Sequence, residues 1–189
     1  MATIESHVIE SWVKQLRQAN ELDRLSATSE IVVRTRGAVR TRGVRVAATA
    51  QAPSDALQQA VTALQREQSP DVRREVVLAL GQIGGAGEAT PLAEIASSDS
   101  DPTVRATAVE ALSKIGGAEA LEALRQSALR DGHEIVRARA VAALGELAMA
   151  AKQSREAPDP VIKVLGEVRD TDRSLYVRDI VLETLAALQ

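Results

Sequence analysis

The sequence predicts an all-α fold, a right-handed α-solenoid built from about five stacked helix pairs. Three observations support this prediction. A sequence motif recurs at a fixed period: Val72, Val104 and Val136, each followed by arginine, are spaced 32 residues apart. Such a period is typical of stacked helical repeats. The apolar residues inside each copy recur at helical spacing. Aromatic residues make up only 1% of the 189-residue chain, so the core must consist of Leu, Val, Ile and Ala, which suits close helix packing.

Composition narrows the classes of function. The chain contains no cysteine, which excludes disulfides, thiolate metal sites and cysteine nucleophiles. It has no apolar run of roughly 18 residues, so we expect no membrane span. Residues 1–10 carry acidic side chains where a signal peptide needs a basic start, and we therefore expect a cytoplasmic protein. A net charge of −3 argues against general affinity for nucleic acid.

The first 50 residues are predicted to form a degenerate helix pair that caps the array. Residues 4–20 have a wide apolar face, which favours a helix with Trp12 in the core. Residues 30–46 are rich in arginine and β-branched side chains. They fit either a second helix, which we favour, or two short strands of about four residues each. Their arginines form a candidate anion patch, or else a solvated face, made of Arg34, Arg36, Arg40, Arg42 and Arg45.

Capping residues mark the helices of the next two pairs. Proline suits the first position of a helix because its missing N–H needs no partner there. Glycine ends a helix by adopting a left-handed conformation at low cost. These rules predict a helix over 56–68, a helix over 70–83 closed by Gly84-Gly85, a helix over 91–97 opened by Thr90-Pro91, and a helix over 102–115 opened by Asp101-Pro102 and closed by Gly116-Gly117.

The rest of the chain repeats the pair twice more. Helices are predicted over 118–129 and 133–149. Residues 150–159 are an insertion, which stretches the spacing from Val136 to the equivalent Val177 to 41 residues. Two further helices are predicted over 160–168 and 173–188. The expected domain organisation is a degenerate pair over 1–50 and an array over 51–189, with repeats at 51–85, 86–117, 118–149 and 159–189.

The second helix of each pair carries a narrow apolar stripe. We number this helix from its first valine as position 0. At 100° per residue, positions 0, 4, 8 and 11 lie within about 80° of arc. They are Val72, Val76, Leu80 and Ile83, then Val104, Ala108, Leu112 and Ile115, then Val136, Ala140, Leu144 and Leu147. No single pair can bury such a stripe alone, so we expect stability to come from the neighbouring repeats.

Position 1 is always arginine, at the edge of the stripe. The residues are Arg73, Arg105, Arg137 and Arg178. We expect each aliphatic stem to pack between layers, while the guanidinium binds a carbonyl of a neighbouring loop or an acid such as Asp71, Asp101 or Glu134. The alternative interpretation is a row of anion sites.

The repeated motif carries a family resemblance. Val-Arg-x-x-Ala/Val-Val-x-Ala-Leu-x-x-Ile-Gly-Gly, preceded by Asp-Pro or Ser-Pro, resembles the short HEAT-like repeats of the phycobilisome lyase family. The resemblance covers residues 55–147 well, 160–188 fairly and 4–50 poorly. It implies HEAT-like helix pairs, with bilin attachment to phycobiliproteins in some members and scaffolding or adaptor roles in many others. Only Trp12 and Tyr176 are aromatic and could line a tetrapyrrole pocket.

Positions 2, 3, 6 and 10 of the second helices point away from the core. Repeat arrays bind along such a continuous surface. Its mixed charge with small and apolar residues suits a protein partner better than DNA. The candidate partner-binding residues are Arg74, Glu75, Leu78, Thr107, Glu110, Lys114, Arg139, Ala142 and Glu146.

Other motifs give no catalytic site. The glycine-rich run 81–87 resembles a phosphate loop, but it follows a helix rather than a strand, so we predict helix capping. His7 and His133 have no second ligand at metal-binding spacing. We therefore expect no metal, no cofactor and no enzymatic activity.

Three functional hypotheses remain open. The leading one is a non-enzymatic scaffold or adaptor that binds another protein along the inner face. The second, implied by the resemblance, is a phycobilin lyase-like or chaperone-like subunit acting on a bilin protein. The third is anion or nucleic-acid binding through Arg34–Arg45. Homo-oligomerisation through the C-terminal helix is also considered, since Leu182, Leu185 and Leu188 are expected to be partly open.

Overall fold

The computed structural model describes residues 10–15, 60–64, 66–83, 85–154 and 158–189. The candidate anion patch lies outside these ranges, as does the choice between helix and strands for residues 30–46. Residues 10–15 and 60–64 are helical. The remaining elements, in chain order, are α4 (Pro70–Ile83), the 3-10 helix η1 (Ala86–Glu88), α5 (Ala89–Ser98), α6 (Pro102–Ile115), α7 (Gly117–Arg130), α8 (Glu134–Gln153), α9 (Asp159–Thr171) and α10 (Leu175–Ala187).

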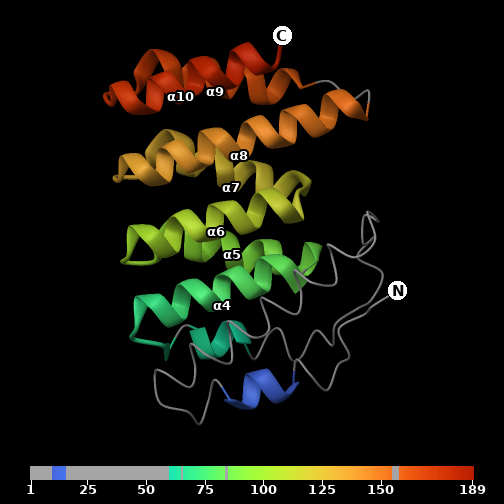
Figure 1. The fold of residues 1–189 in the computed structure, drawn as a ribbon, viewed down its shortest axis with the longest axis vertical. Coiled ribbons are helices and arrows are strands. Elements are labelled where there is room, and N and C mark those ends of the chain that lie inside the picture. The colour runs from blue at the N-terminus through green and yellow to red at the C-terminus, as the bar shows by residue number, and fades with distance from the viewer. Residues whose placement is uncertain (1–9, 16–59, 65, 84, 155–157) are drawn as a thin grey trace.

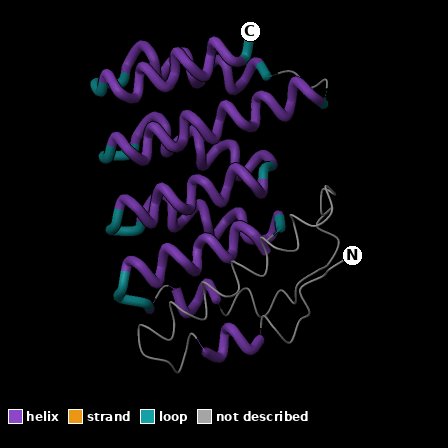
Figure 2. Tube along the Cα trace, viewed as in Figure 1, coloured by secondary structure: helices purple, strands orange, loops and turns teal. Residues whose placement is uncertain are grey.

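The helices stack in two layers (Figure 1). The front layer consists of α4, α6, α8 and α10, and each of these helices contacts the next. The back layer consists of α5, α7 and α9, which also contact one another in order. Each back-layer helix packs on the front-layer helix that follows it in the chain. All regular structure in the described ranges is helical (Figure 2), so the predicted all-α solenoid is confirmed.

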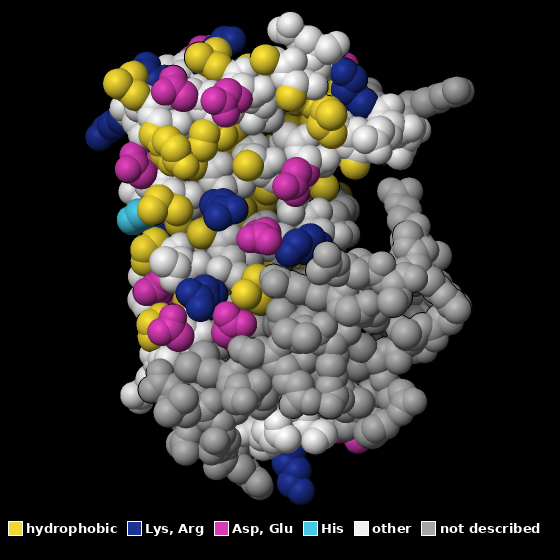
Figure 3. Space-filling model, in the orientation of Figure 1, with side chains coloured by type: hydrophobic (Ala, Val, Ile, Leu, Met, Phe, Trp, Pro, Cys, Tyr) yellow, Lys and Arg dark blue, Asp and Glu magenta, His cyan; other side chains and the backbone are white. Residues whose placement is uncertain are grey.

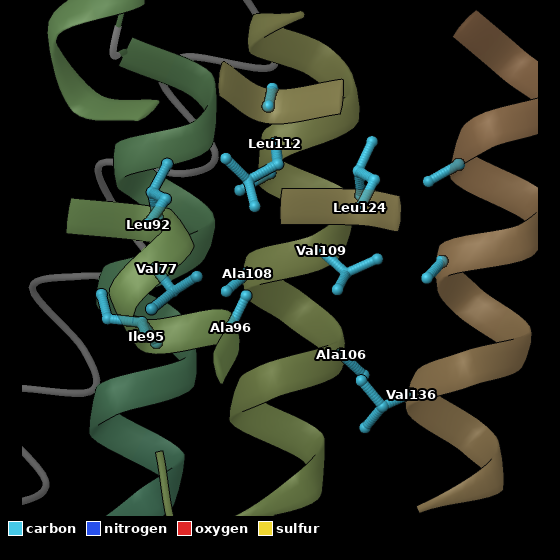
Figure 4. Close-up of a cluster of buried hydrophobic side chains, with 14 of the residues drawn as sticks. Val77, Leu92, Ile95, Ala96, Ala106, Ala108, Val109, Leu112, Leu124 and Val136 are labelled. Atoms are coloured by element: carbon cyan, nitrogen blue, oxygen red, sulfur yellow. The ribbon is translucent and has the colours of Figure 1, made fainter. Parts of the chain in front are cut away.

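The apolar stripe of the second helices forms the core. At positions 0, 4 and 8 of α4, α6 and α8, every side chain is buried. Position 11 is less enclosed, because Ile115 and Leu147 are only half-buried. Between the layers, Leu112 of α6 lies between Leu92 of α5 and Leu124 of α7 (Figure 4). Trp12 is also buried, which confirms its predicted place in the core.

The helix ends follow the predicted capping chemistry in most places. The Asp101 carboxylate accepts the backbone N–H groups of Thr103 at 2.7 Å and Val104 at 3.3 Å, so it caps α6. Gly116 (φ 69°) and Gly117 (φ 87°) then end α6 in the left-handed region that glycine tolerates.

Several helix boundaries differ from the prediction, and one of them is the end of α9, which lies at Thr171 rather than at residue 168. Helix α5 begins at Ala89 with Glu88 as its N-cap, so Thr90 and Pro91 lie inside the first turn. The Thr90 hydroxyl instead donates to the Glu119 carboxylate at 2.6 Å. Helix α8 continues to Gln153 and includes the first four residues of the predicted insertion, since Ala, Lys and Gln are good helix formers.

Gly81 has a role that the sequence interpretation missed. It is buried within α4 rather than at the helix end. A Cβ added there would lie 2.5 Å from the Cβ and 2.8 Å from the Cα of Ala111 in α6. Because the obstacle is partly backbone, Gly81 allows α4 and α6 to approach closely. The predicted helix over 70–83 already contains Gly81, but the contact with Ala111 was not identified from the sequence.

We predict that Gly81→Ala lowers the free energy of unfolding by about 1–3 kcal/mol, because overpacking at Ala111 outweighs the better helix propensity of alanine. Urea denaturation measures the change. Gly145→Ala in α8 is the matched control, because its nearest obstacle is the side chain of Thr184, which can rotate. Equal losses in the two variants would contradict this explanation.

Candidate functional site

The candidate partner-binding residues lie on the front layer, on α4, α6 and α8. Two groups can be separated by exposure. The exposed residues are Lys114, Arg139, Ala142 and Glu146, and the half-buried residues are Arg74, Glu75, Leu78 and Glu110. Thr107 is different, because it is 9% exposed and its hydroxyl donates to the carbonyl of Thr103 at 2.8 Å. Its predicted place on the open surface was therefore wrong, and so was the outward direction predicted for position 2 of α6 and α8, where Ala106 and Ala138 are buried.

Acidic and basic side chains alternate across this surface (Figure 3). Lys114 pairs with Glu110 at 3.0 Å on α6. The Ser113 hydroxyl donates to the Glu146 carboxylate at 3.2 Å and so links α6 to α8. Neighbouring charges of opposite sign reduce the field that a phosphate backbone would need. The surface is therefore better suited to a protein of mixed charge.

The repeated arginines form a ladder between consecutive repeats. Arg105 binds Asp131 in two parallel hydrogen bonds, from Nε to Oδ2 at 2.8 Å and from Nη2 to Oδ1 at 2.9 Å. Its Nη1 also donates to the carbonyl of Asp99 at 2.9 Å, in the loop before α6. Each arginine thus ties the loop before its own helix to the equivalent loop of the next repeat. Such bidentate pairs are the strongest form of protein hydrogen bond.

The same arrangement occurs three times. Arg73 binds Asp99 at 2.8 Å through both Nε and Nη2. Arg137 binds Asp172 at 2.7 and 3.0 Å. The sequence interpretation was right about the loop carbonyls but wrong about the acids. The acids it named, Asp71, Asp101 and Glu134, lie at or next to the start of helices and have other contacts, as the Asp101 cap shows.

Two aspartates of the ladder, Asp131 and Asp172, are held ionised. Partial burial alone would raise the pKa of Asp131, but hydrogen bonds from Arg105 and from the backbone N–H of His133 outweigh it and lower this pKa. The pKa of Asp172 is lowered in the same way, by Arg137 and the N–H of Ser174 against the effect of burial. The guanidinium groups of Arg73, Arg105 and Arg137 already donate hydrogen bonds to the carboxylates of the ladder, so they are not open anion sites.

Arg178 occupies the ladder position of α10 but differs from the other three. Its Nε is enclosed and has no hydrogen-bond partner among the described residues. The equivalent Nε atoms of Arg73, Arg105 and Arg137 each donate to an aspartate of the following repeat.

Sequence reasoning missed Asp99, Asp131 and Asp172 as the ladder acids. A signal for two of them existed, because Asp99 and Asp131 each lie 26 residues after a repeated arginine. The third pair was harder to find. The insertion increases the separation between Arg137 and Asp172 to 35 residues.

Other candidate chemistry is absent from the part of the chain that the structure describes. His133 caps α8, with Nδ1 accepting the N–H of Ile135 at 3.4 Å. Among the described residues, no group of three or more His, Cys, Asp or Glu side chains could hold a metal ion. None of the described helices reaches the length and hydropathy that a membrane span requires. His7 and the arginines of the candidate anion patch lie outside the described ranges.

Comparisons with known proteins agree with this architecture. A family model for HEAT repeats matches residues 22–106 and 91–145. Among solved structures, the complex of CpcE and CpcF of phycocyanin lyase from Nostoc contains a similar chain, with a TM-score of 0.65 and 18% identity over 96% of this chain and 99% of that one. Human deoxyhypusine hydroxylase in complex with glycerol gives a TM-score of 0.55 and 20% identity over 97% of this chain and 63% of that one. At these identities the likeness concerns the fold. A search of curated proteins found no match.

Proposed function

We propose, from the premise that this chain belongs to the family of HEAT-repeat proteins, that it is a non-enzymatic scaffold or adaptor that binds another protein along the front layer. The observation that carries this proposal is the mixed, partly apolar surface that continues across α4, α6 and α8. Small and charged residues alternate there, with Ala142 exposed between Arg139 and Glu146 on α8.

The rigidity of the array supports this role. The arginine ladder fixes each loop to the next, so the front-layer helices keep their spacing without a partner. A surface that is already ordered loses little conformational entropy when it binds. Residues on three different helices can therefore contact one extended partner.

Affinity capture tests the proposal. We expect the double variant Arg139→Glu, Ala142→Glu to lose the protein that the unmodified chain retains from an extract of its native organism, with affinity reduced by about tenfold or more. Both residues are exposed on α8, so the fold should be unaffected. Arg125→Glu on the back-layer helix α7 is the control and should retain the partner. Retention of the same partner by the double variant would contradict the proposed surface.

A second candidate function is a phycobilin lyase-like or chaperone-like subunit that acts on a bilin protein. It is supported by the likeness to a chain of the CpcE and CpcF complex over nearly the whole length of both. A change in the absorbance spectrum of a bilin upon mixing with this chain and a phycobiliprotein would favour it. An unchanged spectrum, with a captured partner that carries no bilin, would favour the scaffold.

A further inference from the structure

One face of α10 is open in a way that the equivalent faces of α4, α6 and α8 are not. Leu182 is 53% exposed, whereas Val77, Val109 and Val141 at the same repeat position are fully buried. Those valines lie on helices that are each followed in the front layer by another helix, and α10 is the last front-layer helix of the described chain. Leu175, one turn before the arginine of the ladder, is 69% exposed.

The same side of the helix carries Arg178, which is half-buried and whose enclosed Nε has no hydrogen-bond partner among the described residues. In each of the three preceding repeats this atom donates to a carboxylate that comes from outside its own repeat. An enclosed guanidinium nitrogen without a partner is costly, because it has lost water without gaining an acceptor. An acid brought to this face from another molecule would remove that cost.

Four residues define the face, which we call the α10 stripe: Leu175, Arg178, Asp179 and Leu182. Their spacing of i, i+3, i+4 and i+7 places them on one side of the helix. Asp179 is exposed. Along the helix the order is apolar, basic, acidic, apolar. If the helix is read in the opposite direction, each leucine takes the place of the other leucine, and the base and the acid change places.

This order makes the stripe complementary to itself. When two copies of α10 pack antiparallel about a twofold axis between residues 178 and 179, Leu175 of one copy meets Leu182 of the other. Arg178 then meets Asp179 of the second copy, and the contact occurs twice because the interface is symmetric. This pairing gives Arg178 a carboxylate, whereas its Nε has no hydrogen-bond partner among the described residues.

An additional repeat of the ordinary kind fits the stripe less well. Asp179 occupies position 2, where α6 and α8 carry Ala106 and Ala138, which are 9% and 3% exposed because the array covers them. Among the preceding front-layer helices only α4 has a charge at this position, on the half-buried Arg74, and a further repeat would likewise take the Asp179 carboxylate partly out of water. A second copy instead offers it Arg178.

We propose that this chain self-associates through the α10 stripe, as an antiparallel pair with two Arg178–Asp179 contacts between copies. The inference goes beyond the binding surface proposed across α4, α6 and α8, since it concerns one face of α10. The partner is a second copy of the same chain.

Charge-reversal variants of the full chain test the proposal. We expect light scattering to show a concentration-dependent dimer for the unmodified protein below about 100 µM. Arg178→Asp places two acids against two acids, and Asp179→Arg places two bases against two bases, so each variant alone should dimerise at least about tenfold more weakly. An equimolar mixture of the two variants should recover the dimer, because every contact is then between opposite charges.

Further variants separate this interface from misfolding and from other surfaces. Leu182→Glu should remove the dimer, while Ile162→Glu, at a 37% exposed residue of α9, should retain it. Circular dichroism melts check that each variant is folded. The proposal is overturned if the unmodified chain is monomeric throughout this range, if Leu182→Glu and Asp179→Arg dimerise as well as the unmodified chain, or if the folded mixture stays monomeric.

Discussion

Replacing Arg105 with alanine should lower the free energy of unfolding by about 3 kcal/mol, the scale for breaking an enclosed ion pair by removing one partner. The side chains of Arg105 and Asp131 are only 15% and 6% exposed. Without Arg105, Asp131 keeps its negative charge in a partly buried loop and loses two charge-assisted hydrogen bonds. Chemical denaturation monitored by circular dichroism measures the loss.

Two control variants test the cause of this loss. Arg125→Ala removes a bidentate pair with Glu122 that is equally short, at 2.8 Å through both nitrogens. This pair lowers the pKa of Glu122 to about 2, yet both side chains face solvent, so we expect an unchanged denaturation midpoint. The double variant Arg105→Ala, Asp131→Ala should recover part of the loss, because no buried charge then remains unpaired.

The loss caused by Arg105→Ala should also depend on pH. The folded state lowers the pKa of Asp131, so the stabilisation is fully present above the unfolded value of about 4 and disappears as pH falls through the lowered folded value. The difference between the unmodified chain and the variant should therefore be constant from about pH 5 to 8 and shrink below about pH 4. A constant difference down to acid pH would mean that packing of the arginine stem, rather than its charge, provides the stability.

The parts of the fold that sequence could predict depend on neighbours close in the chain. The stripe of Val104, Ala108 and Leu112 is a local pattern, because helical periodicity alone places these residues on one face. Caps such as Asp101 are equally local, since a carboxylate at this position reaches the N–H groups of its own helix. Both predictions were confirmed.

The features that sequence reasoning missed depend on how the repeats stack. The ladder acids lie in the next repeat, and nothing close to Arg137 in the chain indicates Asp172. Gly81 looks like part of a glycine-rich helix end until Ala111 of the neighbouring helix is placed against it.

How far residues beside the apolar stripe of α4, α6 and α8 are exposed also depends on how the repeats pack. Position 3 is half-buried as Glu75, buried as Thr107 and exposed as Arg139, although the helical wheel treats the three alike. For this reason the sequence could predict which helix face carries the candidate surface. It could not predict which residues of that face are exposed, which only the structure shows.

Leu112→Ala should also be strongly destabilising, by about 2–5 kcal/mol, because it removes three carbons from a site that cannot collapse easily. Leu112 is fully buried in α6, between back-layer helices on either side (Figure 4). Ile135→Ala is the control, at a residue that is 49% exposed. It should change the free energy of unfolding by less than about 1 kcal/mol.

The position of Leu112 gives this variant a second expected effect. In a repeat array each unit contacts only its neighbours, so stability spreads through the interfaces between units. Helix α6 touches both α4 and α8, and a cavity at Leu112 weakens the connection between the two halves of the front layer. We therefore expect the denaturation curve to broaden as well as shift, with a smaller m-value, because the two halves of the array unfold less cooperatively. A shift with the original steepness would show that the array still unfolds as one unit and that its coupling does not depend on this leucine.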